Sequence, residues 1–176
     1  MLRLLAIILM ATGAPALATS LGGDTDPNER GAAIAVSEVI AELYEFDRFQ
    51  QDALDSADLH GSEGIQNLAE THADAARKRD AALSQIQKQA NTDLTFDCQA
   101  RPQRADLLAA LNASDGPDFI RSFYQVEVAE HRSVIRLLQR YLVAPDNETM
   151  RDFAARELPI LGSALQHAEA ALDDEK

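Results

Sequence analysis

The sequence predicts an all-α fold, an antiparallel up-and-down bundle of four long helices with a short extra helix between the second and third. Three observations predict this class. Apolar residues recur every three or four positions along four long segments, short runs with Gly, Pro, Asp or Asn separate these segments, and no stretch alternates apolar and polar residues as a strand does. Long helices with short connections pack as antiparallel neighbours.

Residues 1–18 have the pattern of a secretory signal peptide. Arg3 precedes an apolar run over residues 4–10, and the segment ALA at 16–18 places small residues at the two positions that a signal peptidase reads. The apolar run is shorter than the roughly 20 residues that span a bilayer. We therefore expect a secreted, soluble chain that begins near Thr19 and resides in the periplasm of a Gram-negative bacterium.

The remainder of the 176-residue chain has room for one domain with a substantial core. Residues 19–30 are polar and contain Gly and Asp, so we expect them to form a flexible leader. Residues 31–176 are expected to form a single helical-bundle domain.

The first two long helices are expected over residues 31–59 and 62–90. The segment HGSEG ends the first, and residues 91–102 are expected to form a loop. Helical spacing places these apolar residues on the inner faces: Val36, Val39, Ile40, Leu43, Phe46, Leu54 and Ala57, then Ile65, Leu68, Ala75, Ala76, Leu83 and Ile86.

The short helix is expected at QRADLLAALN, and the third long helix follows the segment SDGP. Ser114 or Asp115 is the expected N-cap, and Pro117 lies in the first turn, where its missing N–H costs nothing. We expect this helix to end near Val143.

The segment APDN separates the third long helix from the last. Asp146 or Asn147 is the expected N-cap, and the helix should continue to about Leu172. Pro159 lies inside it and is expected to kink it, because proline removes one backbone hydrogen bond and crowds the preceding turn.

The chain is acidic, with a formal net charge of −13. Removal of the signal peptide takes away Arg3 and no acidic residue, so the mature chain is more acidic still. Phosphate binding requires clustered Lys and Arg, so we expect no nucleic-acid partner. The expected partner is an envelope protein or a small ligand, both unidentified.

Polar residues occur on the predicted inner faces. Glu127 and His131 lie four residues apart within the apolar arc of the third long helix, so their side chains can touch. A buried polar group without a partner costs about 1–3 kcal/mol, so these groups should be paired or ligated. Other polar residues placed on inner faces are Asp47, Gln50, His72, Arg79 and Glu157.

A di-iron site of the ferritin type would require Glu-x-x-His pairs. None of the four histidines has Glu three positions before it. A single metal ion could still be bound by His131, Glu127 and His72, if the helices bring His72 close. The preferred interpretation is a buried polar pair in which Glu127 holds His131, with Arg79 or Tyr124 completing the network, and no metal cofactor is expected.

Cys98 is the only cysteine and has no intramolecular disulfide partner. A small apolar filler is the favoured role, and a reactive thiol or an intermolecular disulfide is the alternative. The sequence has no Gly-x-Ser-x-Gly motif and no phosphate-binding glycine loop. It therefore suggests no catalytic residue and favours a protein that is not an enzyme.

Two long blocks, FIRSFYQVEVAEHRSVIRLLQRYL and MRDFAARELPILGSALQHAEAAL, resemble a bacterial family known as domain of unknown function 4142 (DUF4142). This is a secreted ferritin-like helical-bundle family, often labelled outer-membrane protein, and the resemblance covers about residues 44–172. The residues that carry it are Phe119, Phe123, Tyr124 and His131, then Phe153 and Ala154, then Leu158 and Pro159.

The resemblance also shows departures. Family members commonly have histidine at the positions of Ala76 and Ala164, and an acidic residue at the position of Gln50. Of the positions where family members commonly have histidine, only that of His131 is a histidine in this chain. A site that used all of these histidines would therefore be lost or rebuilt here.

Together these observations predict a periplasmic helical-bundle protein with a non-catalytic binding role in the envelope, associated with stress. The alternative is a metal-binding protein or a metal-dependent oxidative enzyme with its site in the bundle core.

Overall fold

The computed structural model describes residues 33–90 and 102–175, and every element in these ranges is a helix. The all-α prediction is therefore confirmed. Residues 1–18, the leader 19–30 and Cys98 lie outside the described residues. The helices are α1 (Val36–His60), α2 (Glu63–Ala90), α3 (Pro102–Asn112), α4 (Gly116–Tyr141) and α5 (Glu148–Asp174).

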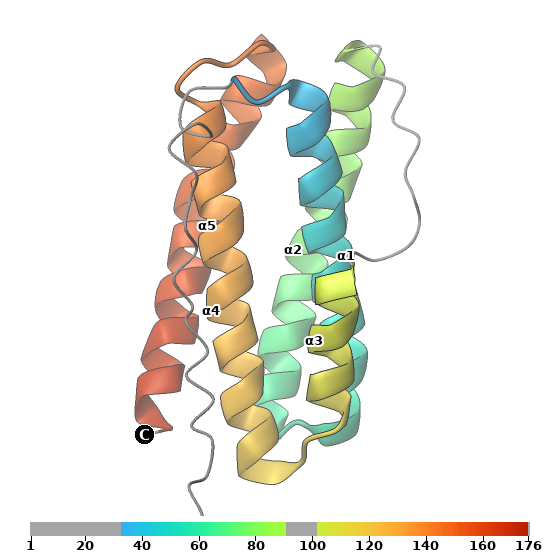
Figure 1. Cartoon of the computed structure of the whole chain (residues 1–176), viewed down its shortest axis with the longest axis vertical. Helices are drawn as coiled ribbons and strands as arrows, with labels where there is room; N and C mark the ends of the chain where they lie inside the picture. The colour runs from blue at the N-terminus through green and yellow to red at the C-terminus, as the bar shows by residue number, and fades with distance from the viewer. Residues whose placement is uncertain (1–32, 91–101, 176) are drawn as a thin grey trace, which may run out of the picture. The chain divides into compact units, whose positions relative to one another are not determined.

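The four long helices pair as two hairpins (Figure 1). A tight connection at Gly61 reverses the chain between α1 and α2, and a short turn reverses it between α4 and α5. The contact between α1 and α4 joins the two hairpins, and the short α3 packs against both of these helices.

Except at the start of α1, the predicted helix ends agree with the observed ones within about two residues. Asn147 caps α5, because its side chain accepts a hydrogen bond of 2.9 Å from the backbone N–H of Met150. Asp115 occupies the N-cap of α4 without a side-chain cap bond. Gly116 follows it with a φ of 55°, a left-handed conformation that favours glycine. Pro102 was expected in the loop but is the first residue of α3, where proline is well tolerated.

The start of α1 is capped from a distant part of the chain. Its N-cap residue, Ala35, has no side chain that could form a cap bond. Both carboxylate oxygens of Asp146 instead lie 3.1 Å from the backbone nitrogen of Val36. Asp146 also accepts a hydrogen bond of 3.0 Å from the hydroxyl of Tyr141. The carboxylate in the turn before α5 therefore ties the beginning of α1 to the end of α4.

The core contains two apolar clusters separated by polar side chains. Phe46 of α1 belongs to the first cluster and Phe49 to the second. On α2 and α4, the buried polar residues likewise fall between members of the second cluster and members of the first. We call the buried residues Asp47, Gln50, His72, Arg79, Glu127 and His131 the polar layer.

The buried Arg104 holds α3 in place. Its guanidinium donates to Glu130 of α4 over 2.9 Å, and to Glu42 and Glu45 of α1 over 2.9 and 3.2 Å. Apart from Arg104, Leu111 is the only residue of α3 that is fully buried. Ion pairs therefore contribute much of the attachment of this helix.

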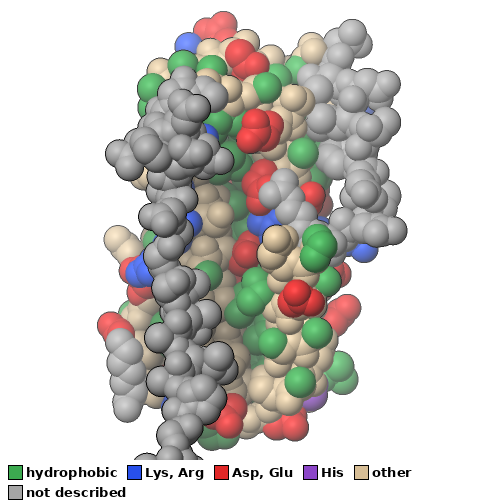
Figure 2. Space-filling view, viewed as in Figure 1, with side chains coloured by type: hydrophobic (Ala, Val, Ile, Leu, Met, Phe, Trp, Pro, Cys, Tyr) green, Lys and Arg blue, Asp and Glu red, His purple; other side chains and the backbone are tan. Residues whose placement is uncertain are grey.

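The surface matches the acidic composition. Figure 2 shows Asp and Glu side chains along the length of the viewed face. Among the described helices, none combines the length and the apolar character that a membrane span requires.

Candidate functional site

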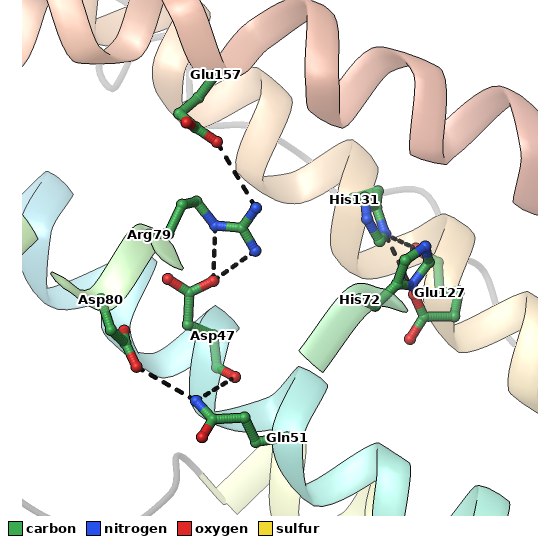
Figure 3. A network of polar contacts seen from close by, with 8 residues as sticks. All are labelled: Asp47, Gln51, His72, Arg79, Asp80, Glu127, His131 and Glu157. Carbon is green, nitrogen blue, oxygen red and sulfur yellow. Dashed lines mark hydrogen bonds and ion pairs between the residues drawn. The ribbon is translucent and has the colours of Figure 1, made fainter. Parts of the chain in front are cut away.

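Three residues of the polar layer meet in one buried cluster. His72 comes from α2, and Glu127 and His131 come from α4 (Figure 3). Their exposed fractions are only 8 %, 1 % and 3 %. Nδ1 of His72 lies 2.8 Å from Oε2 of Glu127, and Nδ1 of His131 lies 3.4 Å from the same oxygen. One potential ligand atom of each residue lies within 4.8 Å of the others, so one metal ion could contact all three.

The hydrogen bonds around the histidines resemble those of metal ligands. Nδ1 of His131 lies 2.9 Å from the backbone carbonyl oxygen of Glu127. A backbone carbonyl oxygen only accepts, so Nδ1 of His131 must carry hydrogen in this contact. In a neutral ring this leaves Nε2 with a free lone pair. Metal-binding histidines are commonly held in this way, with the other ring nitrogen donating to a carboxylate or a carbonyl.

The surroundings keep His131 neutral. Burial lowers the pKa of His131 below its ordinary value, and the partial compensation from Glu127 does not reverse this direction. The ring of Phe46 meets His131 edge-on at 5.2 Å, and the two histidine rings lie 5.1 Å apart. A neutral imidazole is the form that binds a metal ion.

A second network lies beside this cluster (Figure 3). Oδ1 of Asp47 accepts from Nε and Nη2 of Arg79 over 2.7 and 2.6 Å. Nη1 of Arg79 lies 3.7 Å from the carboxylate of Glu157. Gln51 donates to the backbone carbonyl of Asp47 and to the carboxylate of Asp80 over 3.2 and 3.3 Å. Three helices, α1, α2 and α5, are thus connected through one guanidinium.

A family model described as a domain of unknown function (DUF4142) matches residues 25–171. The chain belongs to this family. No curated protein and no solved structure matches the chain. The match includes every residue of the polar layer, but the family's description gives no activity. The chemistry of this DUF4142 domain must therefore be argued from its own side chains.

Asp47 of the DUF4142 domain has an unusual protonation state. Burial raises the pKa of its carboxyl to about 8, although Arg79 opposes this change. The negative charge of the Asp80 carboxylate also raises the pKa of Asp47. Asp47 therefore keeps its proton at neutral pH, while its Oδ1 still accepts from Arg79.

The substitution Asp47→Asn is expected to flatten the pH dependence of stability. The folded chain retains the Asp47 proton up to about pH 8, whereas the ordinary pKa is 3.8. The free energy of unfolding of the native chain should therefore fall as the pH rises between these values, by at most about 1.4 kcal/mol per pH unit. Urea unfolding of both proteins across this range would measure the difference, and parallel curves would contradict the raised pKa.

The structure also shows which expected contacts do not form. Arg79 was considered as a partner for the Glu127 and His131 pair, but its hydrogen bonds go to Asp47 instead. Tyr124 contacts the ring of Phe123, with 6.0 Å between the ring centroids. His72, which sequence spacing could place only on an inner face, is the residue that completes the cluster.

A groove of about 470 Å³ lies between α2 and α5. Arg79, Glu157 and the exposed Ile160 are among the residues that line it. Its volume is within the range of small-molecule sites. His72, Glu127 and His131 are not part of its lining, so the groove adjoins the Arg79 network and not the histidine cluster.

Proposed function

We propose that this chain is a non-catalytic metal-binding protein of the bacterial cell envelope, in which His72, Glu127 and His131 bind one divalent transition-metal ion. Its long helices would form an up-and-down bundle of the ferritin-like type. The secretory pattern of residues 1–18 supports an envelope location in the periplasm.

The convergence of the three residues carries this proposal. Sequence spacing alone favoured a structural pair of Glu127 and His131, and the contact of 2.8 Å between His72 and Glu127 adds the third donor from another helix. Ligand atoms around a tetrahedral zinc ion, with bonds of about 2.1 Å, lie about 3.4 Å apart. The potential ligand atoms of the cluster lie within 4.8 Å of one another, a bound that includes this spacing.

The donor set indicates the class of metal. Two imidazoles and one carboxylate suit zinc, iron, manganese or copper better than calcium or magnesium, which prefer oxygen ligands. The deep burial of all three side chains leaves little room for an organic substrate beside the ion. This favours binding or storage of the metal over catalysis.

The purified mature chain is expected to bind one zinc ion, as measured by isothermal titration calorimetry. Binding to the folded state should raise its stability, by about 2.7 kcal/mol when free zinc is 100 times the dissociation constant. A chelator should reverse the gain. Binding should weaken at acid pH, because metal ligands must be deprotonated.

Two variants and one control test the assignment. His72→Ala and His131→Ala should each weaken zinc binding more than about 100-fold, because loss of a ligand exceeds the usual cost of losing a supporting contact. The control is His167→Ala, since His167 is exposed on α5 and outside the cluster. The proposal would be overturned if neither experiment detected stoichiometric zinc, iron, manganese or copper. The two experiments are titration of the purified chain and metal analysis of protein isolated from its native envelope.

A further inference from the structure

The side-chain amide of Gln50 is buried without a hydrogen-bond partner. The residue is 1 % exposed, and neither Nε2 nor Oε1 has a hydrogen-bond partner among residues 33–90 and 102–175. Its neighbour Gln51 has the same functional group and forms two hydrogen bonds. A buried amide that forms none is costly, so its retention in the core calls for a partner that the described residues do not supply.

The packing of α1 against α4 places Gln50 at the level of Glu127. The two helices run in opposite directions (Figure 1). The ring of Phe46 of α1 contacts that of His131 of α4. One turn forward on α1 leads from Phe46 to Gln50, and one turn back on α4 leads from His131 to Glu127. Each step is about 6 Å along the helix axis, so the two residues stay level.

The packing of α1 against α2 gives the same placement. Asp47 of α1 contacts Arg79 of the antiparallel α2. Gln50 lies three residues after Asp47 on α1, and Ala76 lies three residues before Arg79 on α2. Because the helices are antiparallel, Gln50 therefore lies opposite Ala76. His72 is one turn from Ala76 on α2. Ala76 is fully buried and contributes only a methyl group at this level. The unpartnered amide therefore shares its level of the core with the carboxylate of the cluster.

We propose that Gln50 is the fourth protein ligand of the metal site, with Oε1 of its amide as the donor. This inference rests on the proposed metal-binding function and assigns a residue from α1 to a site otherwise built from α2 and α4. A neutral amide oxygen beside two imidazoles and one carboxylate leaves one net positive charge on a site that holds a divalent ion.

The test compares Gln50→Leu with the native chain in the metal-free and zinc-bound states. Leucine removes the donor, so zinc affinity should fall at least about tenfold in calorimetry. It also removes an unpartnered polar group, so the urea midpoint of the metal-free protein should rise. A lower zinc affinity together with a higher urea midpoint of the metal-free protein would identify Gln50 as a ligand. Gln51→Leu is the matched control and should lower the urea midpoint while leaving zinc affinity unchanged.

The outcomes separate this inference from the proposal on which it rests. If the native chain binds no metal, both are overturned. If His72→Ala abolishes zinc binding but Gln50→Leu binds zinc as tightly as the native chain, only the role of Gln50 is overturned. Gln50→Ala provides a second variant without the donor, and its zinc affinity should fall by a similar factor.

Discussion

Replacing Asp47 with leucine is expected to lower the free energy of unfolding by about 3–5 kcal/mol, because the buried guanidinium of Arg79 loses two hydrogen bonds, each worth about 1.5–3 kcal/mol to a charged group. Arg79 is 5 % exposed and donates two hydrogen bonds to Asp47. A guanidinium cannot lose its charge in a protein, so the variant keeps a buried cation. The nearest remaining carboxylate, that of Glu157, is 3.7 Å away. Urea or thermal unfolding at neutral pH measures the loss.

Two further variants locate the origin of this loss. Asp47→Asn keeps an oxygen acceptor for Arg79, so it should cost clearly less than Asp47→Leu. The double substitution of Asp47→Leu with Arg79→Met removes the buried charge and should recover much of the stability. Equal losses for leucine and asparagine at position 47 would show that the unpaired guanidinium is not the cause.

The second large effect is expected for Arg104→Met, with a loss of about 2–4 kcal/mol. Methionine removes the ion pairs to Glu42, Glu45 and Glu130, and it leaves three carboxylates close together. Burial raises the pKa of Glu130, which reflects the cost of keeping this carboxylate charged inside the bundle. Because α3 has few other buried residues, it should detach. Limited proteolysis should then cut within α3 earlier than in the native chain.

Arg132→Met is the matched control for Arg104. Arg132 pairs with Glu169, but the two side chains are 54 % and 38 % exposed. Surface pairs of this kind usually contribute less than about 1 kcal/mol. Similar losses for the two methionine variants would mean that the three carboxylates do not depend on Arg104.

The sequence predicted the helices well because their apolar spacing is regular, and it predicted one helix start poorly. The expected beginning of α1 at residue 31 is at least five residues too early, since the helix starts at Val36. Ala35 offers no local cap signal, and Asp146 caps this end from the turn before α5. A capping residue 110 positions away is not visible in a local pattern.

The candidate site was predictable only within single helices. Helical spacing paired Glu127 with His131, because both lie on α4. The contact of His72 depends on how α2 packs against α4, and spacing along one helix says nothing about that alignment. Arg104 was missed because the apolar residues of the short α3 are spread around the helix and define no single inner face. Glu42 and Glu45, three residues apart on α1, were the available signal for a basic partner.

The capping of α1 by Asp146 has a consequence for cooperativity. The first turn of α1 lacks a cap within its own hairpin, and the turn of the other hairpin supplies one. Any opening that separates the two hairpins removes this cap, so the helix start should fray at the same time. The beginning of α1 is therefore only as stable as the association of α1 and α2 with α4 and α5.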